Sequence, residues 1–197
     1  MDPGTLIRMH QHQNEEIISW LPEGVMRHDD RQDHTLVTDP EHLMVMNAGS
    51  GFWHSEETLA DDPPLRMLQI FVRPHSLDLE PDIQHEPIPD PVVNEWRHLF
   101  GPEGTDAPLS VRNDVDFYDC RLDADATTTL PSRAGWHTYL YVFEGAVEVG
   151  ETPVGFTESA LVTDDGEVPV TAAEDATLVA FTINPDAPIT RQGTIGR

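Results

Sequence analysis

Short apolar runs separated by turn-forming residues recur along this chain, and their length and spacing predict an all-β protein. The run Ile17–Leu21 is followed by the turn Pro22–Gly24, after which Val25 and Met26 resume the apolar pattern. This order of strand, tight turn and strand is typical of antiparallel hairpins. Further runs of strand length stand at Thr35–Val37, Leu43–Met46, Met67–Val72, Tyr139–Phe143, Ala146–Val149, Ser159–Val162 and Thr177–Ile183.

A helix is indicated at one place only. Residues 92–100 favour a short helix, because Pro91 suits the start of a first helical turn. Seventeen prolines and thirteen glycines divide the remaining sequence into short segments, as an all-β fold with many turns requires.

Two segments of the first half recur in the second half in the same order. Ser19–Met26 resembles Leu140–Val147, which begins 121 residues later, and Leu68–Pro74 resembles Leu178–Pro185. A strand–turn–strand unit, followed later by a strand that ends in proline, therefore occurs twice. The repeat predicts two similar β-barrels in tandem.

A stretch rich in proline separates the two repeats and sets the expected domain boundaries. Prolines are dense between Pro81 and Pro91, as in a semi-rigid connection. We expect an N-terminal barrel over residues 1–80, a connection with the short helix over residues 81–105, and a C-terminal barrel over residues 106–197.

The charge balance of the chain is strongly acidic. Thirty-six Asp and Glu residues stand against eleven basic residues, all of them Arg, for a formal net charge of −25. The absence of Lys favours adaptation to a high-salt cytoplasm, as in a halophilic organism, over an ordinary acidic surface. A nucleic-acid backbone is excluded as a direct partner, because binding it takes basic patches.

Cysteine content and hydropathy indicate in which cell compartment the protein resides. Cys120 is the only cysteine, so neither an intrachain disulfide nor a Cys-based metal cluster can form. Residues 1–20 lack the basic start and long apolar run of a secretory signal, and no stretch approaches the roughly 20 apolar residues of a membrane span. We therefore expect a cytoplasmic protein that does not enter a membrane.

Two residue pairs carry the candidate chemistry. His10 and His12 are two residues apart, and so are His54 and Glu56. On a β-strand, residues two apart point to the same face, so each pair can direct both side chains into a barrel interior. Three imidazoles and one carboxylate suit one divalent transition metal, with iron, nickel, copper, manganese, cobalt and zinc all open.

Each pair alone is a weak signal, because many of the ten histidines of this chain are expected to be solvated. The surroundings of His54 strengthen it, since a glycine-rich turn and the aromatics Phe52 and Trp53 precede it, as in a substrate pocket. In the second repeat, the two histidines of the first pair are replaced by Pro131 and Arg133. We therefore expect the metal site in the first barrel only.

Several segments resemble the pirin family of bicupins in order and spacing, with high specificity in the first barrel and faintly in the second half. They are Met9–His12 with Glu16–Trp20, Pro22–Asp29, Met46–Glu56 and Leu68–Val72. The resemblance implies two tandem cupin barrels, each a double-stranded β-helix or jelly roll, and one metal, commonly Fe(II), in the N-terminal barrel. By position, the implied ligands are His10, His12, His54 and Glu56.

Two departures from the pirin pattern qualify this expectation. Family members have an additional N-terminal segment that supplies strands to the first barrel, whereas Met1 lies just before the His-x-His strand. We expect a truncated N-terminal barrel. Either it is open on one side, or a homodimer partner covers it, or the true start of the protein lies further upstream. Glu16 occupies the glutamate-ligand position of the wider cupin motif, so we assign it as second-choice ligand or as a partner that orients an imidazole.

Three functions from different classes fit this site. The first is a metal-dependent dioxygenase of the quercetin 2,3-dioxygenase type. In this enzyme Glu56 takes a proton from a flavonol-like aromatic enol, Phe52 and Trp53 flank the enol, and O2 attacks the enol. The second is a non-catalytic regulatory protein that contacts partners according to its metal or redox state. The third is a structural bicupin whose histidines have lost their role. The sequence favours the first without deciding that the chain is an enzyme.

Overall fold

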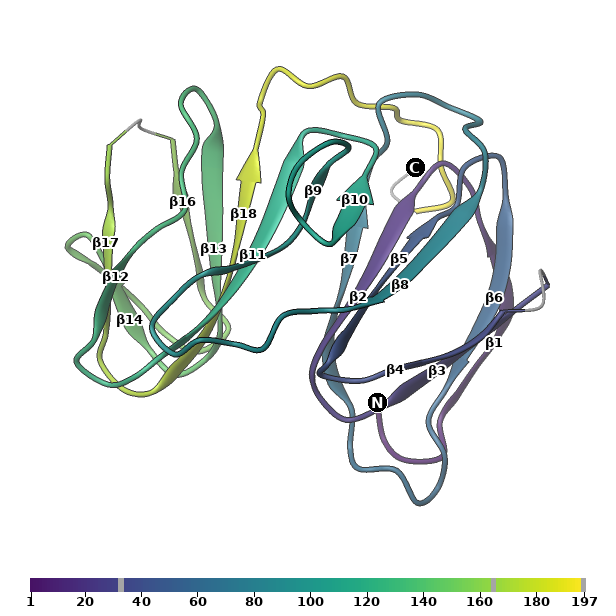
Figure 1. Cartoon of the computed structure of the whole chain (residues 1–197), viewed down its shortest axis with the longest axis horizontal. Coiled ribbons are helices and arrows are strands. Elements are labelled where there is room, and N and C mark those ends of the chain that lie inside the picture. The colour runs from purple at the N-terminus through teal and green to yellow at the C-terminus, as the bar shows by residue number, and fades with distance from the viewer. Residues whose placement is uncertain (32–33, 164–165, 196–197) are drawn as a thin grey trace. The chain divides into compact units, whose positions relative to one another are not determined.

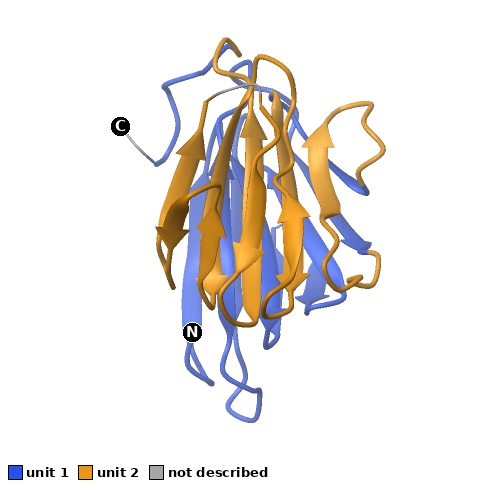
Figure 2. Ribbon diagram, turned by 90° about the vertical axis from the view of Figure 1, so that its left-hand side faces the viewer, with its two compact units in different colours: residues 1–88, 108–113, 188–197 blue, residues 89–107, 114–187 orange. Residues whose placement is uncertain are grey.

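The structure, a computed structural model, describes residues 1–31, 34–163 and 166–195, and these ranges form strands and no helix (Figure 1). A membrane-spanning helix is accordingly not found among them. The chain divides into two compact units, shown in different colours in Figure 2. Unit 1 comprises residues 1–88, 108–113 and 188–197, and unit 2 comprises residues 89–107 and 114–187.

Unit 1 contains two antiparallel sheets with a shared apolar core. One sheet has the strand order β1-β6-β3-β4, and the other has the order β7-β2-β5-β8 (Figure 1). Leu21, Met26, Met44 and Leu65 meet between them, so strands of both sheets contribute to the core. The bounds are β1 Leu6–His12, β2 Glu16–Glu23, β3 Met26–Asp30, β4 Thr35–Thr38, β5 His42–Asn47, β6 Phe52–Glu57, β7 Arg66–Val72, β8 Asp82–Pro87 and, beside β5, β10 Leu109–Val111.

Unit 2 repeats this two-sheet plan. Its strand orders are β9-β11-β18-β13-β16 and β12-β17-β14-β15. Leu140, Val142 and Leu178 from the first sheet pack with Val147 and Val170 from the second. The bounds are β9 Arg97–Pro102, β11 Val115–Leu122, β12 Thr127–Thr129, β13 His137–Glu144, β14 Val147–Val149, β15 Thr152–Val154, β16 Ser159–Val162, β17 Pro169–Ala172 and β18 Ala176–Ile183.

The all-β prediction is confirmed, because the apolar runs fall in β2–β5, β7, β13, β14, β16 and β18. The helix predicted over residues 92–100 is wrong, because residues 97–102 form β9. There Leu99 and Phe100 are buried against β11, and Phe100 stacks on Phe117 with ring centroids 5.1 Å apart. This long-range pairing outweighs the local helix signal. The structure also groups residues 81–88 and 188–195 with unit 1. The predicted boundaries placed the first of these ranges in the connection and the second in the C-terminal barrel.

The sequence repeat has the same strand pairing in both units. β2 pairs with β7, and β13 pairs with β18, each with an irregularity in register just before the turn. The turn glycines, Gly24 and Gly145, have φ values of +90° and +79°. A Cβ on them would lie 2.7 Å from the Cα of Leu65 and 2.8 Å from the Cα of Ala176, respectively. Both turns therefore need glycine for backbone conformation and for close packing.

We expect Gly145→Ala to destabilise the protein more than Gly135→Ala. Gly135 has a similar φ of +76°, but no neighbouring atom lies within 4 Å of the place that an alanine methyl group would occupy. Both variants bear the left-handed backbone cost of about 1–2 kcal/mol, and only Gly145→Ala adds an overpacking cost of about 1–3 kcal/mol. Urea unfolding measures the difference. Equal losses in the two variants would contradict the close approach at Gly145.

Candidate metal centre

The strand β6 lies inside its sheet and carries two of the predicted ligands. His54 and Glu56 alternate with outward-facing residues and are both buried. β1 pairs with one side of β6 and places His10 opposite His54, while β3 pairs with the other side and places Asp30 opposite His54. Strand pairing thus brings polar side chains from three segments around one buried imidazole.

Three of the predicted ligands, His10, His12 and His54, come together. Each offers one ring nitrogen, and these three nitrogens lie within 4.8 Å of one another. The Nε2 atoms of His10 and His54 are 3.1 Å apart. The ring centroids are separated by 4.9 Å for His10 and His12, 4.4 Å for His10 and His54, and 5.2 Å for His12 and His54.

The Nδ1 atoms of His10 and His12 are held by acceptors. The Nδ1 of His10 donates to the carbonyl oxygen of Arg8 at 2.9 Å, and that of His12 donates to the carboxylate of Glu15 at 2.8 Å. A carbonyl or carboxylate oxygen can only accept, so the proton of each neutral ring lies on Nδ1. The Nε2 lone pair of each ring is therefore free to bind a cation.

The Nδ1 of His54 begins a chain of polar groups that ends near the surface. It lies 3.4 Å from the Nδ1 of His28, whose Nε2 lies 3.4 Å from Oδ2 of Asp30. The same oxygen accepts a 2.8 Å hydrogen bond from His34, whose side chain is 41% exposed. Because the carboxylate can only accept, a chain of donors directed from His54 towards Asp30 leaves the Nε2 of His54 unprotonated.

Burial and neighbouring histidines keep His54 neutral. Burial, together with the neighbouring His10, His28 and His12, lowers the pKa of His54 to about 3. Burial also lowers the pKa of His28. At neutral pH both rings are therefore neutral, which is the form of an imidazole that binds a metal.

These side chains fit a divalent transition metal. The Nε2 atoms of His10 and His54 face each other, and His12 adds a third ring nitrogen to the same group. For His10 and His12 the Nδ1 partners are groups that only accept. Facing lone pairs repel one another unless a proton or a cation lies between them. Three imidazole nitrogens are a common donor set for metals of this class, and the partners on Nδ1 fix the rings as in other histidine-ligated sites.

The fourth predicted ligand, Glu56, lies on the other side of His54. Its Oε1 is 3.8 Å from the Nδ1 of His54, and its carboxylate groups with His28 and His54 rather than with the three imidazoles. Gln69 of β7 donates to both carboxylate oxygens at 3.2 Å. Burial raises the pKa of Glu56, and the hydrogen bond from Gln69 opposes this. The structure thus places Glu56 next to the imidazole cluster but not within it.

The chain is similar to known proteins along both units. The family model described as Pirin matches residues 2–72, and the one described as Quercetinase C-terminal cupin domain matches residues 98–183. A pirin-like protein of Caulobacter vibrioides is 30% identical over 179 residues, which are 90% of this chain and 77% of that relative. This chain belongs to the pirin family.

More distant relatives of this pirin-family chain include a named enzyme and solved structures. A quercetin 2,3-dioxygenase of Escherichia coli strain K12 is 22% identical over 89% of the chain and 75% of its own length. The structure of YhhW from Escherichia coli aligns with a TM-score of 0.85 at 21% identity, covering 94% of this chain and 78% of that one. The same bacterial pirin in complex with nickel(II) gives a TM-score of 0.84 at 21% identity, covering 94% and 79%. These likenesses establish the bicupin fold.

Three residues named from the sequence lie in surroundings that differ from the expected ones. Glu16 accepts hydrogen bonds from the side chain of Asn47 and the backbone of Arg112, and it is Glu15 that holds His12. Trp53 is 37% exposed on the face of β6 opposite to His54, because neighbouring strand residues point to opposite faces. Phe52 shares the face of His54 but packs into a core cluster.

Sequence reasoning missed several residues around the imidazoles. His28 and Asp30 are two apart on β3, the same signal that singled out the other pairs. Glu15 and Gln69 carry no such pattern. Glu15 lies three residues after His12 in the loop between β1 and β2, where strand alternation makes no prediction, and Gln69 reaches Glu56 from the other sheet of unit 1. Phe71 belongs to the apolar run Met67–Val72, yet it is 39% exposed and its ring lies 6.0 Å from that of His12.

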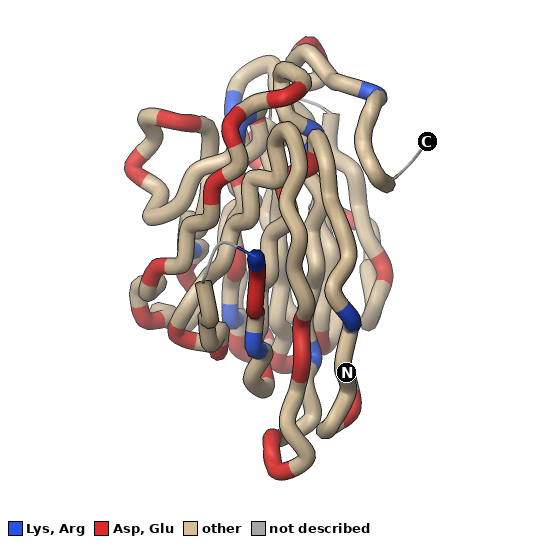
Figure 3. The backbone as a smooth tube through the Cα atoms, turned by 90° about the vertical axis from the view of Figure 1, so that its right-hand side faces the viewer, with Lys and Arg blue, Asp and Glu red and all other residues tan. Residues whose placement is uncertain are grey.

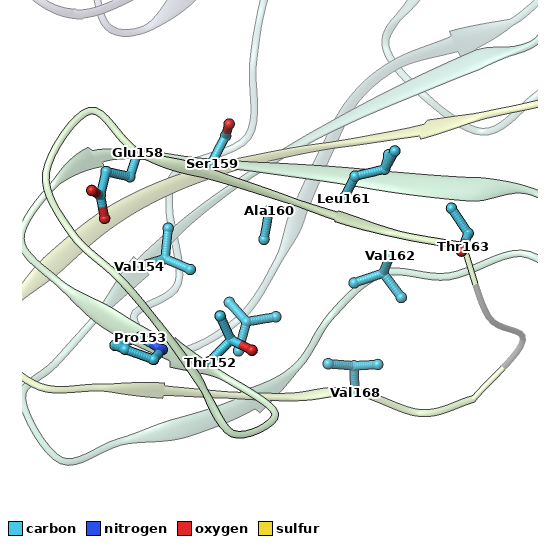
Figure 4. Close-up of a pocket in the computed structure, with 11 residues that line it drawn as sticks. Thr152, Pro153, Val154, Glu158, Ser159, Ala160, Leu161, Val162, Thr163 and Val168 are labelled. Atoms are coloured by element: carbon cyan, nitrogen blue, oxygen red, sulfur yellow. The ribbon is translucent and has the colours of Figure 1, made fainter.

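The pirin-family fold also contains a hollow in unit 2, away from these residues. Figure 4 shows it between β15 and β16, with a volume of about 810 Å³ and a lining that includes Val154, Ala160, Val162 and Val168. Both clusters of three metal-ligating groups found among the described residues lie in unit 1. The candidate site is therefore the imidazole cluster, and not this hollow.

We expect His28→Ala to weaken metal binding about 10- to 100-fold, because His54 loses the acceptor for its Nδ1 proton. His28→Asn should recover part of the affinity, since its amide oxygen lies near the former Nδ1. The measurement is competition for Ni(II) against a chromophoric chelator. His42→Ala, which changes a histidine stacked on His85 elsewhere in unit 1, is the matched control. Unchanged affinity in His28→Ala would refute the role of the histidine chain.

Proposed function

We propose that this pirin-family chain is a metal-dependent dioxygenase of the quercetin 2,3-dioxygenase type that acts on an aromatic enol. The observation that carries the proposal is the convergence of ring nitrogens from three imidazoles within 4.8 Å of one another, beside a buried carboxylate. His10, His12 and His54 would hold one divalent metal. The family resemblance makes Glu56 the fourth ligand, which requires its carboxylate to turn from the Nδ1 side of His54 towards the metal. Family resemblance favours Fe(II), and the nickel(II) complex of a relative makes nickel the first alternative.

The side chains around the cluster have separate proposed roles in proton removal and substrate contact. A bound metal supplies positive charge for a deprotonated enol and a redox-active centre for O2. Glu56 is a stronger base than an exposed glutamate, because burial raises its pKa, and it would take the proton of the enol. Gln69 holds both oxygens of that carboxylate. Phe71, exposed beside His12, offers an aromatic surface for the rings of the substrate.

The enzyme proposal predicts turnover of a flavonol that depends on Glu56. Anaerobic titration of iron-, nickel- and copper-loaded protein with quercetin should shift the ultraviolet absorption of the flavonol, and oxygen uptake should follow when O2 is admitted. Glu56→Gln should lower the turnover about 10²- to 10⁴-fold, because the general base is lost. Ser55→Ala, on the outward face of the same strand, should leave the turnover unchanged.

The outcomes of this experiment separate the three functional classes. About one metal per chain without oxygen uptake under any loading would reject the enzyme and favour the regulatory protein. Elemental analysis that finds no metal in protein purified without a His tag, and none after loading, would favour the structural bicupin. His10→Ala and His54→Ala serve as controls for the metal content.

We also propose that the acidic composition adapts this protein to high salt. Acidic residues outnumber basic ones on the strands and loops drawn in Figure 3, in keeping with the net charge of −25. Repulsion among these charges opposes folding at low ionic strength, and added salt screens it.

We expect the Tm to rise by at least about 5 °C between roughly 0.1 M and 1 M KCl, where the Debye length falls from about 10 Å to about 3 Å. For a chain of this size, this corresponds to about 2 kcal/mol. Calorimetry at constant pH measures the shift. A Tm that stays level or falls over this range would contradict adaptation to salt.

A further inference from the structure

The carboxylate of Glu15 joins the metal cluster to a segment far away in the sequence. Glu15 and His12 are both buried, with side chains 3% and 7% exposed. One carboxylate oxygen, Oε2, accepts a 2.8 Å hydrogen bond from Nδ1 of His12. The other, Oε1, accepts a hydrogen bond from the backbone N–H of Ile195. A single buried side chain therefore contacts both a metal-ligand candidate and the C-terminal segment.

The C-terminal segment, residues 188–195, is held against this part of unit 1 by further hydrogen bonds. The backbone N–H of Gln13 donates to the hydroxyl of Thr194 at 2.7 Å, and the backbone N–H of Thr194 donates to the carbonyl of Gln13 at 3.2 Å. Arg73 donates to the carbonyl of Ile195 at 3.1 Å and to that of Thr190 at 3.3 Å. The segment is therefore docked at both of its ends.

Close packing leaves little room between this segment and the loop that follows β1. A Cβ placed on Gly193 would lie 3.0 Å from Oε1 of Glu15 and 3.1 Å from the carbonyl oxygen of Gln13. The backbone of the segment thus covers the carboxylate directly. A covered carboxylate depends on its hydrogen-bond donors, because water cannot replace them.

We infer that Glu15 is a positioning residue that couples docking of the C-terminal segment to metal binding at His12. This inference rests on the metal site of the proposed function and extends it to a segment that contributes no ligand. Hydrogen bonding from Ile195 fixes the orientation of the carboxylate. The carboxylate in turn fixes the Nδ1 proton and the ring orientation of His12, which presents Nε2 to the metal.

The coupling has to act in both directions. If docking of the segment increases the affinity of the site for metal, then metal binding increases the stability of the docked segment by the same factor. Metal binding withdraws electron density from His12 and makes its Nδ1–H a stronger donor to Glu15. The amide of Ile195 shares that carboxylate, so its protection from exchange reports on the metal although it is not a ligand.

Glu15→Gln is the sharpest variant, because it keeps the size of the side chain and removes its charge. The amide can accept only through its single oxygen, so one of the two donors loses its partner. We expect the affinity for Ni(II) to fall about 10- to 100-fold and the visible spectrum of the Co(II)-loaded protein to change. The matched control is Glu23→Gln, which removes an exposed carboxylate paired with Arg66 in the same unit and should change neither.

Hydrogen exchange tests the reverse direction on the wild-type chain. Ni(II) should slow exchange of the Ile195 amide at least about tenfold, and this slowing should be lost in both Glu15→Gln and His12→Ala. Thermal unfolding of each variant verifies that it is folded. The coupling alone is overturned if the Ni(II) affinity of Glu15→Gln is within twofold of wild type. It is also overturned if the exchange rate of the Ile195 amide is the same with and without Ni(II). A wild-type chain that binds no metal overturns both the coupling and the proposed function.

Discussion

The pairing of β6 with β1 on one side and β3 on the other is the constraint on which the candidate site depends. It places His10 and Asp30 opposite the same residue, His54. A slip of one residue in either pairing would turn the relevant side chains to the opposite face of the sheet. The irregular register between Ile7 and His10 is part of this arrangement, because it sets which residues of β1 face His54.

Hydrogen-bond direction then determines the chemistry of the cluster. A carbonyl and a carboxylate at its edge accept hydrogen bonds from the Nδ1 atoms of His10 and His12, and the Nε2 atoms of His10 and His54 face each other. Burial keeps His54 neutral, so this ring presents a nitrogen lone pair to a cation and does not repel it with a positive charge. The carboxylates of Glu15, Asp30 and Glu56 lie next to the imidazoles and supply the negative charge that favours a bound cation.

The two units show how one fold plan can keep or lose such a site. β2 with β7 and β13 with β18 form equivalent pairs around glycine turns of the same conformation. The residues of unit 2 that correspond to the first histidine pair are Pro131 and Arg133. The strand pairs and turns that build the fold repeat, whereas the candidate ligands stand in unit 1 only among the described residues.

The sequence by itself determined the features that depend on neighbouring residues. Apolar runs, turn glycines and the spacing of His10 and His12 follow from local backbone geometry, which fixes the strands and the face that each residue occupies. Tertiary structure alone decided which distant groups meet. The choice of Glu15 over Glu16 beside His12 depends on the conformation of the loop between β1 and β2, which strand alternation does not describe. The docking of Ile195 on that carboxylate depends on where the C-terminal segment packs. A hydrogen bond between segments 180 residues apart leaves no periodic signal in the sequence, since its energy is set by three-dimensional proximity.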